Sequence, residues 1–229
     1  YLLGLLYEKG ESVNPDFEKS RDYFEKSGLQ GNSSGYNKLG VIYCIGKTVE
    51  QNFSKAFEYF EKSSKQGNSN ALRNLGNLYM IGNGVEQNYR KAIEYFEQAS
   101  KLGNSDAMVT LGTAYLEGNG VEKNYRKAIE YFEQASKLGN PYAMCNLGTL
   151  YKNGRGVEKN ISKAIEYYEQ SSKLGDVVSM HHLGTLYENG RGVEKNISKA
   201  IEYYEQSSKL GNVVSMYHLG ELYENGRGV

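Results

Sequence analysis

A leucine-glycine pair, with a tyrosine three residues after the glycine, recurs along this chain at a fixed interval. The glycines stand 36 residues apart, at Gly4, Gly40, Gly76, Gly112, Gly148, Gly184 and Gly220. The matching tyrosines are Tyr7, Tyr43, Tyr79, Tyr115, Tyr151, Tyr187 and Tyr223. A fixed period of about 20 to 50 residues is the signature of a solenoid, in which each copy packs against its neighbours. The sequence therefore predicts one repeated structural unit.

Each repeat contains signals for two helices, here called helix A and helix B. In the third copy, Asn68 is a good N-cap for a helix A that runs to about Met80. Asn88 then caps a helix B that runs from Tyr89 to about Leu102. Gly103 follows at the position where a helix commonly ends with a left-handed residue. Because the stop at Gly103 is followed directly by the next cap, we expect adjacent helices to be antiparallel.

Apolar residues at helical spacing predict one buried stripe on each helix. In the third copy the two stripes are Ala71, Leu72, Leu75, Leu78 and Tyr79 on helix A, and Ala92, Ile93, Tyr95, Phe96 and Ala99 on helix B. A glycine inside a helix costs about 0.5–1 kcal/mol relative to alanine. Since every copy carries that glycine, we expect another helix to lean directly on its Cα atom, with the tyrosine filling the space beside the crossing.

The segment from Ala71 to Gly103 follows the pattern A-x-x-x-L-G-x-x-Y-x-x-G-x-G-V-x-x-N-x-x-K-A-x-x-Y-[FY]-x-x-[AS]-x-x-x-G. It closely resembles the Sel-one-like repeat, a family of tetratricopeptide-like solenoids. The resemblance implies an all-α, right-handed α/α superhelical solenoid of helix-turn-helix repeats that forms a single domain over residues 1–229. The expected repeats are 1–30 (partial), 31–66, 67–102, 103–138, 139–174, 175–210 and 211–229 (partial). The first copy departs from the pattern at Glu11-Ser12-Val13 and at Ser20-Arg21.

Comparing the copies separates a uniform scaffold from a variable stripe. Gly154 to Gly175 is identical to Gly190 to Gly211, whereas positions −3, +1 and +4 from each helix A glycine differ between copies. These positions share one helix face, and the resemblance implies that helix A lines the concave groove. The candidate groove residues are Asn37, Val41, Cys44, Arg73, Asn77, Met80, Val109, Thr113, Leu116, Cys145, Thr149, Lys152, His181, Thr185, Glu188, Tyr217, Glu221 and Glu224.

The resemblance implies a non-catalytic scaffold or adaptor that binds a partner protein or peptide through this groove. The groove residues change from apolar near Met80 and Leu116 to acidic near Glu221 and Glu224, which favours a ligand with apolar residues toward the N-terminal end. The alternative is a regulatory or targeting arm of a larger protein whose catalytic domain, for example a kinase, lies outside this chain.

Charge and composition argue against several other classes. Lys+Arg and Asp+Glu number 27 each, so the chain offers no net electrostatic attraction for nucleic acid. No apolar run approaches the roughly 20 residues that a membrane helix needs. The 21 tyrosines and 7 phenylalanines fall mainly at core positions of both helices. Cys44 and Cys145 are too far apart in the repeat order for a disulfide, which favours a reducing, cytoplasmic location.

Three groups of residues resemble catalytic or ligand sites without completing one. Gly46-Lys47-Thr48 looks like the end of a P-loop, but it follows a helix and lacks the earlier glycine. Cys145 and His181 occupy one slot in adjacent repeats and raise the alternatives of a nucleophile with its base or of two zinc ligands. No third ligand or orienting acid accompanies them, so we expect solvated or partner-facing side chains. We expect no catalytic residue, metal or cofactor.

The chain starts inside a repeat and stops after a helix A. Leu2, Leu3, Leu5 and Leu6 surround the first glycine without a preceding repeat to cover them. Terminal repeats of solenoids normally carry a polar outer face. We therefore expect that a piece cut at these ends associates end to end or is capped by neighbouring chain.

Overall fold

The computed structural model of the chain describes residues 1–10, 13–46 and 49–227. Within these residues the chain forms thirteen α helices and no β strand, which confirms the all-α repeat solenoid. Two departures noted in the sequence, Glu11-Ser12 and Lys47-Thr48, lie outside the described residues. The chain divides into two compact units, Tyr1–Lys123 and Asn124–Val229. A single solenoid domain over residues 1–229 stays a prediction.

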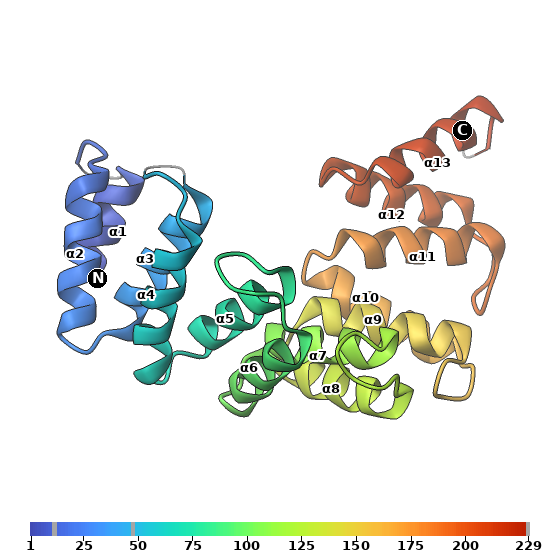
Figure 1. Cartoon of the computed structure of the whole chain (residues 1–229). Coiled ribbons are helices and arrows are strands. Elements are labelled where there is room, and N and C mark those ends of the chain that lie inside the picture. Colours follow the sequence, from blue (N-terminus) through green and yellow to red (C-terminus); the bar gives the residue numbers. More distant parts are fainter. Residues whose placement is uncertain (11–12, 47–48, 228–229) are drawn as a thin grey trace. The chain divides into compact units, whose positions relative to one another are not determined.

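The first unit contains four A helices and three B helices that alternate along the chain. The A helices are α1 (Leu2–Lys9), α3 (Ser33–Ile45), α5 (Ser69–Ile81) and α7 (Ser105–Glu117). The B helices are α2 (Phe17–Leu29), α4 (Phe53–Lys65) and α6 (Tyr89–Lys101). Each helix packs against the next one in the chain, and Figure 1 shows the pair α3 and α4 side by side.

The second unit contains three A helices and three B helices in the same alternation. The B helices are α8 (Tyr125–Lys137), α10 (Ile161–Lys173) and α12 (Ile197–Lys209). The A helices are α9 (Pro141–Asn153), α11 (Val177–Asn189) and α13 (Val213–Glu224). The successive helices α11, α12 and α13 lie next to one another in the orange and red part of Figure 1.

Capping side chains and left-handed glycines at the helix ends account for the helix boundaries. Oδ1 of Asn88 accepts a 3.0 Å hydrogen bond from the backbone N–H of Lys91 at the start of α6. At the other end, Gly103 adopts a φ of +78°, which a residue with a Cβ rarely tolerates. Asn104 then accepts from the N–H of Ala107 at 2.9 Å and starts α7. Helix α6 therefore ends, and helix α7 begins, where the sequence predicts.

A backbone hydrogen bond ties the ends of the loop inside each repeat. In the third copy the N–H of Asn88 donates to the carbonyl oxygen of Tyr79 at 2.8 Å. Gln87 adds a 2.9 Å bond from Nε2 to the carbonyl oxygen of Met80, which satisfies one of the last free carbonyl groups of α5. The loop thereby sets where helix B begins relative to the end of helix A.

The interior glycine of helix A is covered by an aromatic ring from helix B of the same repeat. A Cβ atom placed on Gly76 would stand 2.6 Å from Cε1 of Phe96, a fully buried side chain. Gly4, Gly40, Gly148 and Gly184 meet Phe24, Phe60, Tyr168 and Tyr204 in the same way. The expected close approach at the glycine is present, and an aromatic side chain of helix B makes it.

The tyrosine that follows each of these glycines stacks on the helix B tyrosine that directly precedes the glycine-covering ring. The rings of Tyr79 and Tyr95 are 5.6 Å apart with an interplanar angle of 13°. Lys91 places its ammonium 5.2 Å from the centroid of the Tyr79 ring. Such cation–π contacts contribute about 0.5–1 kcal/mol at exposed sites. Because Tyr79 and Tyr95 are half-buried, this stack of side chains lies at the edge of the repeat and not in its fully buried centre.

The first repeat keeps this packing despite its different residues. Ser20, which replaces the usual alanine of helix B, is buried, and its Oγ donates to the carbonyl oxygen of Gly4 at 2.8 Å. The Phe24 ring covers Gly4 as in the other copies. The serine hydroxyl therefore links α2 to α1 where the other copies bury a methyl group.

Candidate binding surface and pockets

The eighteen variable residues at positions −3, +1 and +4, here called the A-helix stripe, are mostly half-buried. All nine of the first unit, from Asn37 to Leu116, are neither fully exposed nor fully buried. Val41 and Cys44 pack against the buried cluster that contains Leu75 and Leu78. The stripe therefore touches the core on one side and solvent on the other.

Polar residues on and beside the stripe link neighbouring A helices. Nδ2 of Asn74 donates to Oδ1 of Asn37 at 3.1 Å, which joins α5 to α3. Arg73 forms a 3.3 Å ion pair with Asp106, which joins α5 to α7. Asn37 and Arg73 thus have a structural role in addition to any role in binding.

In the second unit the stripe is half-buried on α9 and α11 and exposed on α13. Thr149 shares a 3.0 Å hydrogen bond with the hydroxyl of Tyr168. Glu188 accepts a 2.8 Å bond from the hydroxyl of Tyr204. Tyr217 and Glu221 bond to each other at 2.9 Å on the exposed face of α13. The structure therefore leaves the end of the stripe on α13 most open to solvent.

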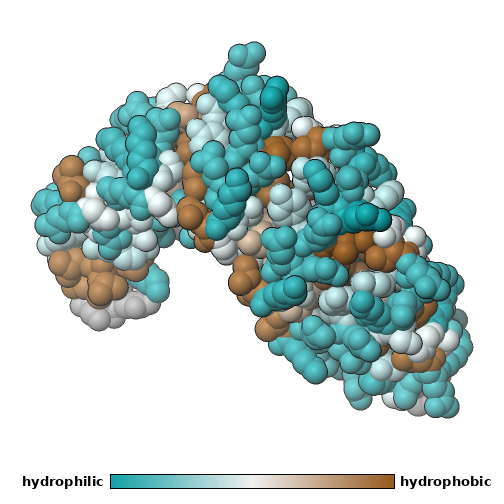
Figure 2. All heavy atoms as spheres, turned by 90° about the horizontal axis from the view of Figure 1, so that it is seen from below, coloured by the Kyte–Doolittle hydropathy of each residue, from teal (hydrophilic) through white to brown (hydrophobic). Residues whose placement is uncertain are grey.

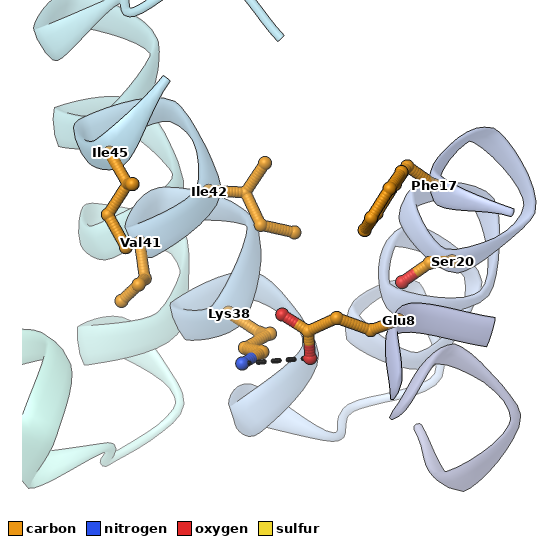
Figure 3. A pocket seen from close by; sticks show the side chains of 7 residues that line it. All are labelled: Glu8, Phe17, Ser20, Lys38, Val41, Ile42 and Ile45. Carbon is orange, nitrogen blue, oxygen red and sulfur yellow. Dashed lines mark ion pairs between the residues drawn. The ribbon is translucent and has the colours of Figure 1, made fainter. Parts of the chain in front are cut away.

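One pocket, of about 180 Å³, lies between α1, α2 and α3 in the first unit. Figure 3 shows Phe17 and Ile42 on opposite sides of its opening and an ion pair at its lower edge. That pair joins Nζ of Lys38 to Oε2 of Glu8 at 3.0 Å. Val41 is the stripe residue that contributes to the wall. The one cation and the one acid of the wall satisfy each other. The rest of the lining is apolar apart from Ser20, whose hydroxyl donates to the carbonyl oxygen of Gly4.

A second pocket, of about 330 Å³, lies between α9, the start of α10 and the end of α11. We call it the basic pocket, because its polar lining consists of cations, amides and a hydroxyl: Lys152, Asn153, Lys159, Thr185, Asn189 and Arg191. Lys152 and Thr185 belong to the stripe. Ile161 and Leu186 complete the wall. On the face shown in Figure 2, several apolar patches lie among polar residues.

The geometry around Cys145 does not assemble a nucleophile. Burial raises the pKa of the Cys145 thiol to about 12, so the thiolate is scarce at neutral pH. Burial, followed by the nearby charges of His218 and Lys152, lowers the pKa of His181. His181 instead directs Nδ1 toward Oγ of Ser215 at 3.2 Å. Among the described residues, no group of three or more His, Cys, Asp or Glu side chains is arranged to hold a metal ion.

The half-buried histidines pack on tyrosines of helix B, and whether they also face a partner stays a prediction. His182 lies 4.8 Å from Tyr168 between ring centroids, and His218 stacks on Tyr204 at 5.1 Å and 4°. The sequence carried a signal for these contacts. Where helix B has phenylalanine instead of Tyr168 or Tyr204, the next helix A has lysine, asparagine or threonine at the histidine position.

Both cysteines are free thiols in the structure. No helix in the described part of the chain combines the length and the apolar character that crossing a bilayer requires. Exposed apolar residues gather on α1, where Leu2 and Leu3 are 79% and 51% exposed, and on α13, where Val213 is 74% exposed. Association through these residues stays a prediction, as does the compartment.

Paired antiparallel helices, a fixed period and ring-covered glycines define an α/α repeat solenoid. The sequence profile of the Sel1 repeat matches seven successive segments, residues 1–32, 33–68, 69–104, 105–140, 141–176, 177–212 and 213–229. The chain therefore belongs to the Sel1 repeat family. Repeats of this family generally serve as scaffolds for protein–protein interaction and are typically non-catalytic.

Solved structures with the same fold agree with this assignment. The chain is 31% identical to c5321, a protective antigen present in uropathogenic Escherichia coli strains, and the two structures match with a TM-score of 0.85. The match includes 98% of this chain and 48% of the c5321 chain. It is 30% identical to a Sel1 repeat protein from Oxalobacter formigenes, with a TM-score of 0.89 over 97% of this chain and 89% of that one. The immunity protein Pa5087 from Pseudomonas aeruginosa is 24% identical to this chain and has a TM-score of 0.57. The match includes 80% of this chain and 67% of the Pa5087 chain, and it shows the fold alone. Among curated protein sequences, none matches the chain.

Proposed function

We propose that this chain is a non-catalytic scaffold that binds a partner peptide or protein through the A-helix stripe. The observation that carries the proposal is the contrast between scaffold and stripe. The residues that hold each repeat together, such as Gly76 and Phe96, recur in type and packing, whereas the stripe residues vary between copies, most of all at position −3. A stable frame that presents varied side chains suits the recognition of one particular ligand.

The chemistry of the stripe indicates the polarity of that ligand. In the first unit, Val41, Met80 and Leu116 offer apolar surface. In the second unit, Glu221 and Glu224 are exposed and acidic. We propose an extended or helical peptide whose apolar residues contact the stripe of the first unit.

A peptide selected on the intact chain from a random display library tests this proposal. The double change Met80→Asp and Leu116→Asp should abolish its binding, because two charges replace apolar contact surface. The control is Leu102→Asp with Leu138→Asp, since these leucines are 54% and 56% exposed at the ends of B helices, off the stripe. Circular dichroism of both variants establishes that they are folded. Unchanged affinity in the stripe variant would show that the ligand binds elsewhere.

A second candidate function is a regulatory or targeting arm of a larger protein. The chain spans about half the length of the c5321 antigen, and the other half of that antigen lies outside the match. Activity of an enzyme encoded in the same reading frame, measured with and without these repeats, tests this alternative. Equal activity and equal localisation of both forms would exclude it.

A further inference from the structure

Three cations converge on the basic pocket without a carboxylate to neutralise them. Lys152 comes from the last turn of α9, Lys159 from the loop before α10, and Arg191 from the loop after α11. The pocket wall contains no acid, and no ion pair joins these three side chains to a carboxylate within the described residues. A chain with zero net charge therefore concentrates positive charge at one hollow.

In the next repeat, the arginine equivalent to Arg191 is paired with a carboxylate of the same chain. Glu188 and Arg227 stand 36 residues after Lys152 and Arg191, and there Oε1 of Glu188 lies 4.0 Å from Nη1 of Arg227. In the basic pocket a lysine occupies the place of that glutamate. Arg191 consequently faces a like charge where Arg227 faces an opposite one.

This arrangement disfavours the charged form of Lys152. Burial lowers the pKa of Lys152, and Arg191 lowers it further, against an opposing contribution from Cys145. Lys152 also lies 5.8 Å from the centroid of the Tyr168 ring, which only partly compensates its charge. An anion between Lys152 and Arg191 would relieve the repulsion and supply the charge that Glu188 supplies to Arg227.

We propose that the basic pocket binds a carboxylate side chain of an acidic partner peptide. The inference rests on the proposed function, because Lys152 and Thr185 are stripe residues and the pocket opens beside them. Arginine and lysine around a carboxylate form charge-assisted hydrogen bonds, roughly twice as strong as neutral ones. The side-chain amide of Asn153 can add a neutral donor on the same wall. The hydroxyl of Thr185 already donates to the carbonyl oxygen of His182 at 2.8 Å. The bound peptide thus carries glutamate or aspartate where it crosses from α9 to α11.

The test is the affinity of labelled hexaglutamate for the intact chain, measured by fluorescence anisotropy at low ionic strength. Lys152→Glu is the decisive variant, because it rebuilds toward Arg191 the ion pair that Glu188 makes with Arg227 and so leaves the fold intact. We expect this change to weaken hexaglutamate binding by about tenfold or more. Lys209→Glu makes the same change of net charge at an exposed site on α12 and should leave the affinity within about twofold.

Two further probes separate the acidic peptide from other ligands. Hexaglutamine should not bind, and inorganic phosphate should compete only at concentrations far above those of hexaglutamate. Equal binding of hexaglutamine, or equal losses in Lys152→Glu and Lys209→Glu, would overturn the inference. Binding of phosphate with no binding of hexaglutamate would instead identify a site for small free anions and would also overturn it.

The two proposals can fail separately. In one outcome, Lys152→Glu leaves the affinity for hexaglutamate and for the display-selected peptide unchanged, while the change at Met80 and Leu116 abolishes binding of the selected peptide. The proposal of a carboxylate site in the basic pocket is then wrong, and the scaffold function stands. If hexaglutamate depends on Lys152 while the selected peptide is unaffected by every stripe substitution, the pocket binds acid but the stripe is not the partner surface.

Discussion

The ring of Phe96 lies against Gly76 so closely that a Cβ atom on this glycine would stand 2.6 Å from Cε1 of the ring. The contact joins helix A to helix B inside one repeat and excludes every side chain larger than hydrogen at Gly76. It explains why the cost of a glycine within a helix is accepted in successive copies.

Replacing Gly76 by alanine should therefore destabilise the fold. Overpacking of a dense core costs about 1–3 kcal/mol, more than the gain in helix propensity. Gly220 is the matched control, because nothing lies within 4 Å of the position of its Cβ in this chain. Gly220→Ala should raise the stability by about 0.5–1 kcal/mol. Urea unfolding measures both free energies, and similar effects of the two changes would contradict the packing role.

The cap of α6 provides a second stability prediction. Asn88→Ala removes the acceptor for the N–H of Lys91 and should cost about 0.5–2 kcal/mol. Asn88→Asp keeps an acceptor oxygen and should be close to neutral. Thermal unfolding followed by far-ultraviolet circular dichroism, which reports helix content, distinguishes the two. Equal melting temperatures for alanine and aspartate would mean that the side-chain bond contributes nothing.

His182 should make stability depend on pH. Burial, with Lys152 and His181 nearby, lowers the pKa of His182 to about 4, below the ordinary value of about 6.5. The unfolded chain then binds more protons between these pH values, so stability is full above about pH 6.5 and falls as the pH drops toward 4. His182→Gln should flatten this part of the curve by about 1–3 kcal/mol. His181 also titrates nearby. The comparison is therefore between the two slopes of stability against pH, and identical slopes would refute the prediction.

Cys145 should react slowly with thiol reagents. Because burial raises its pKa to about 12, its thiolate fraction at pH 8 is lower than that of an ordinary cysteine by on the order of a hundredfold or more. The Cys44→Ser variant, in which Cys145 is the remaining thiol, should react with Ellman's reagent slowly when folded and rapidly in denaturant. Rapid reaction of the folded variant would revive a chemical role for Cys145.

Local signals explain how well the helix boundaries could be predicted. The expected helix B of the third repeat ran from Tyr89 to about Leu102, and α6 is Tyr89–Lys101. Asn88 and Gly103 act within three or four residues of themselves, so their effect does not depend on the rest of the fold. The identity of the ring that covers Gly76 was not predictable in this way, because helical phase places Phe96 on a stripe without naming its contact.

Contacts between repeats were the hardest part of the site to predict. His182 meets Tyr168 and Lys152 meets Arg191 only through packing of residues from different repeats. Aligning the copies at their period would have paired Lys152 with Glu188 and shown the exchange of charge. The alignment alone does not show that these positions border a hollow, which depends on how α9, α10 and α11 pack.

The stacked tyrosines give the molecule an optical property that follows from its construction. The chain contains no tryptophan, so its near-ultraviolet signal arises chiefly from tyrosine. The pairs Tyr7–Tyr23, Tyr43–Tyr59, Tyr79–Tyr95, Tyr151–Tyr167 and Tyr187–Tyr203 all have ring centroids 5.6 to 5.8 Å apart. Each pair exists only while helix A and helix B of its own repeat are docked. Near-ultraviolet circular dichroism therefore counts docked repeats without any label, and a tyrosine-to-leucine change in one pair removes the contribution of that repeat alone.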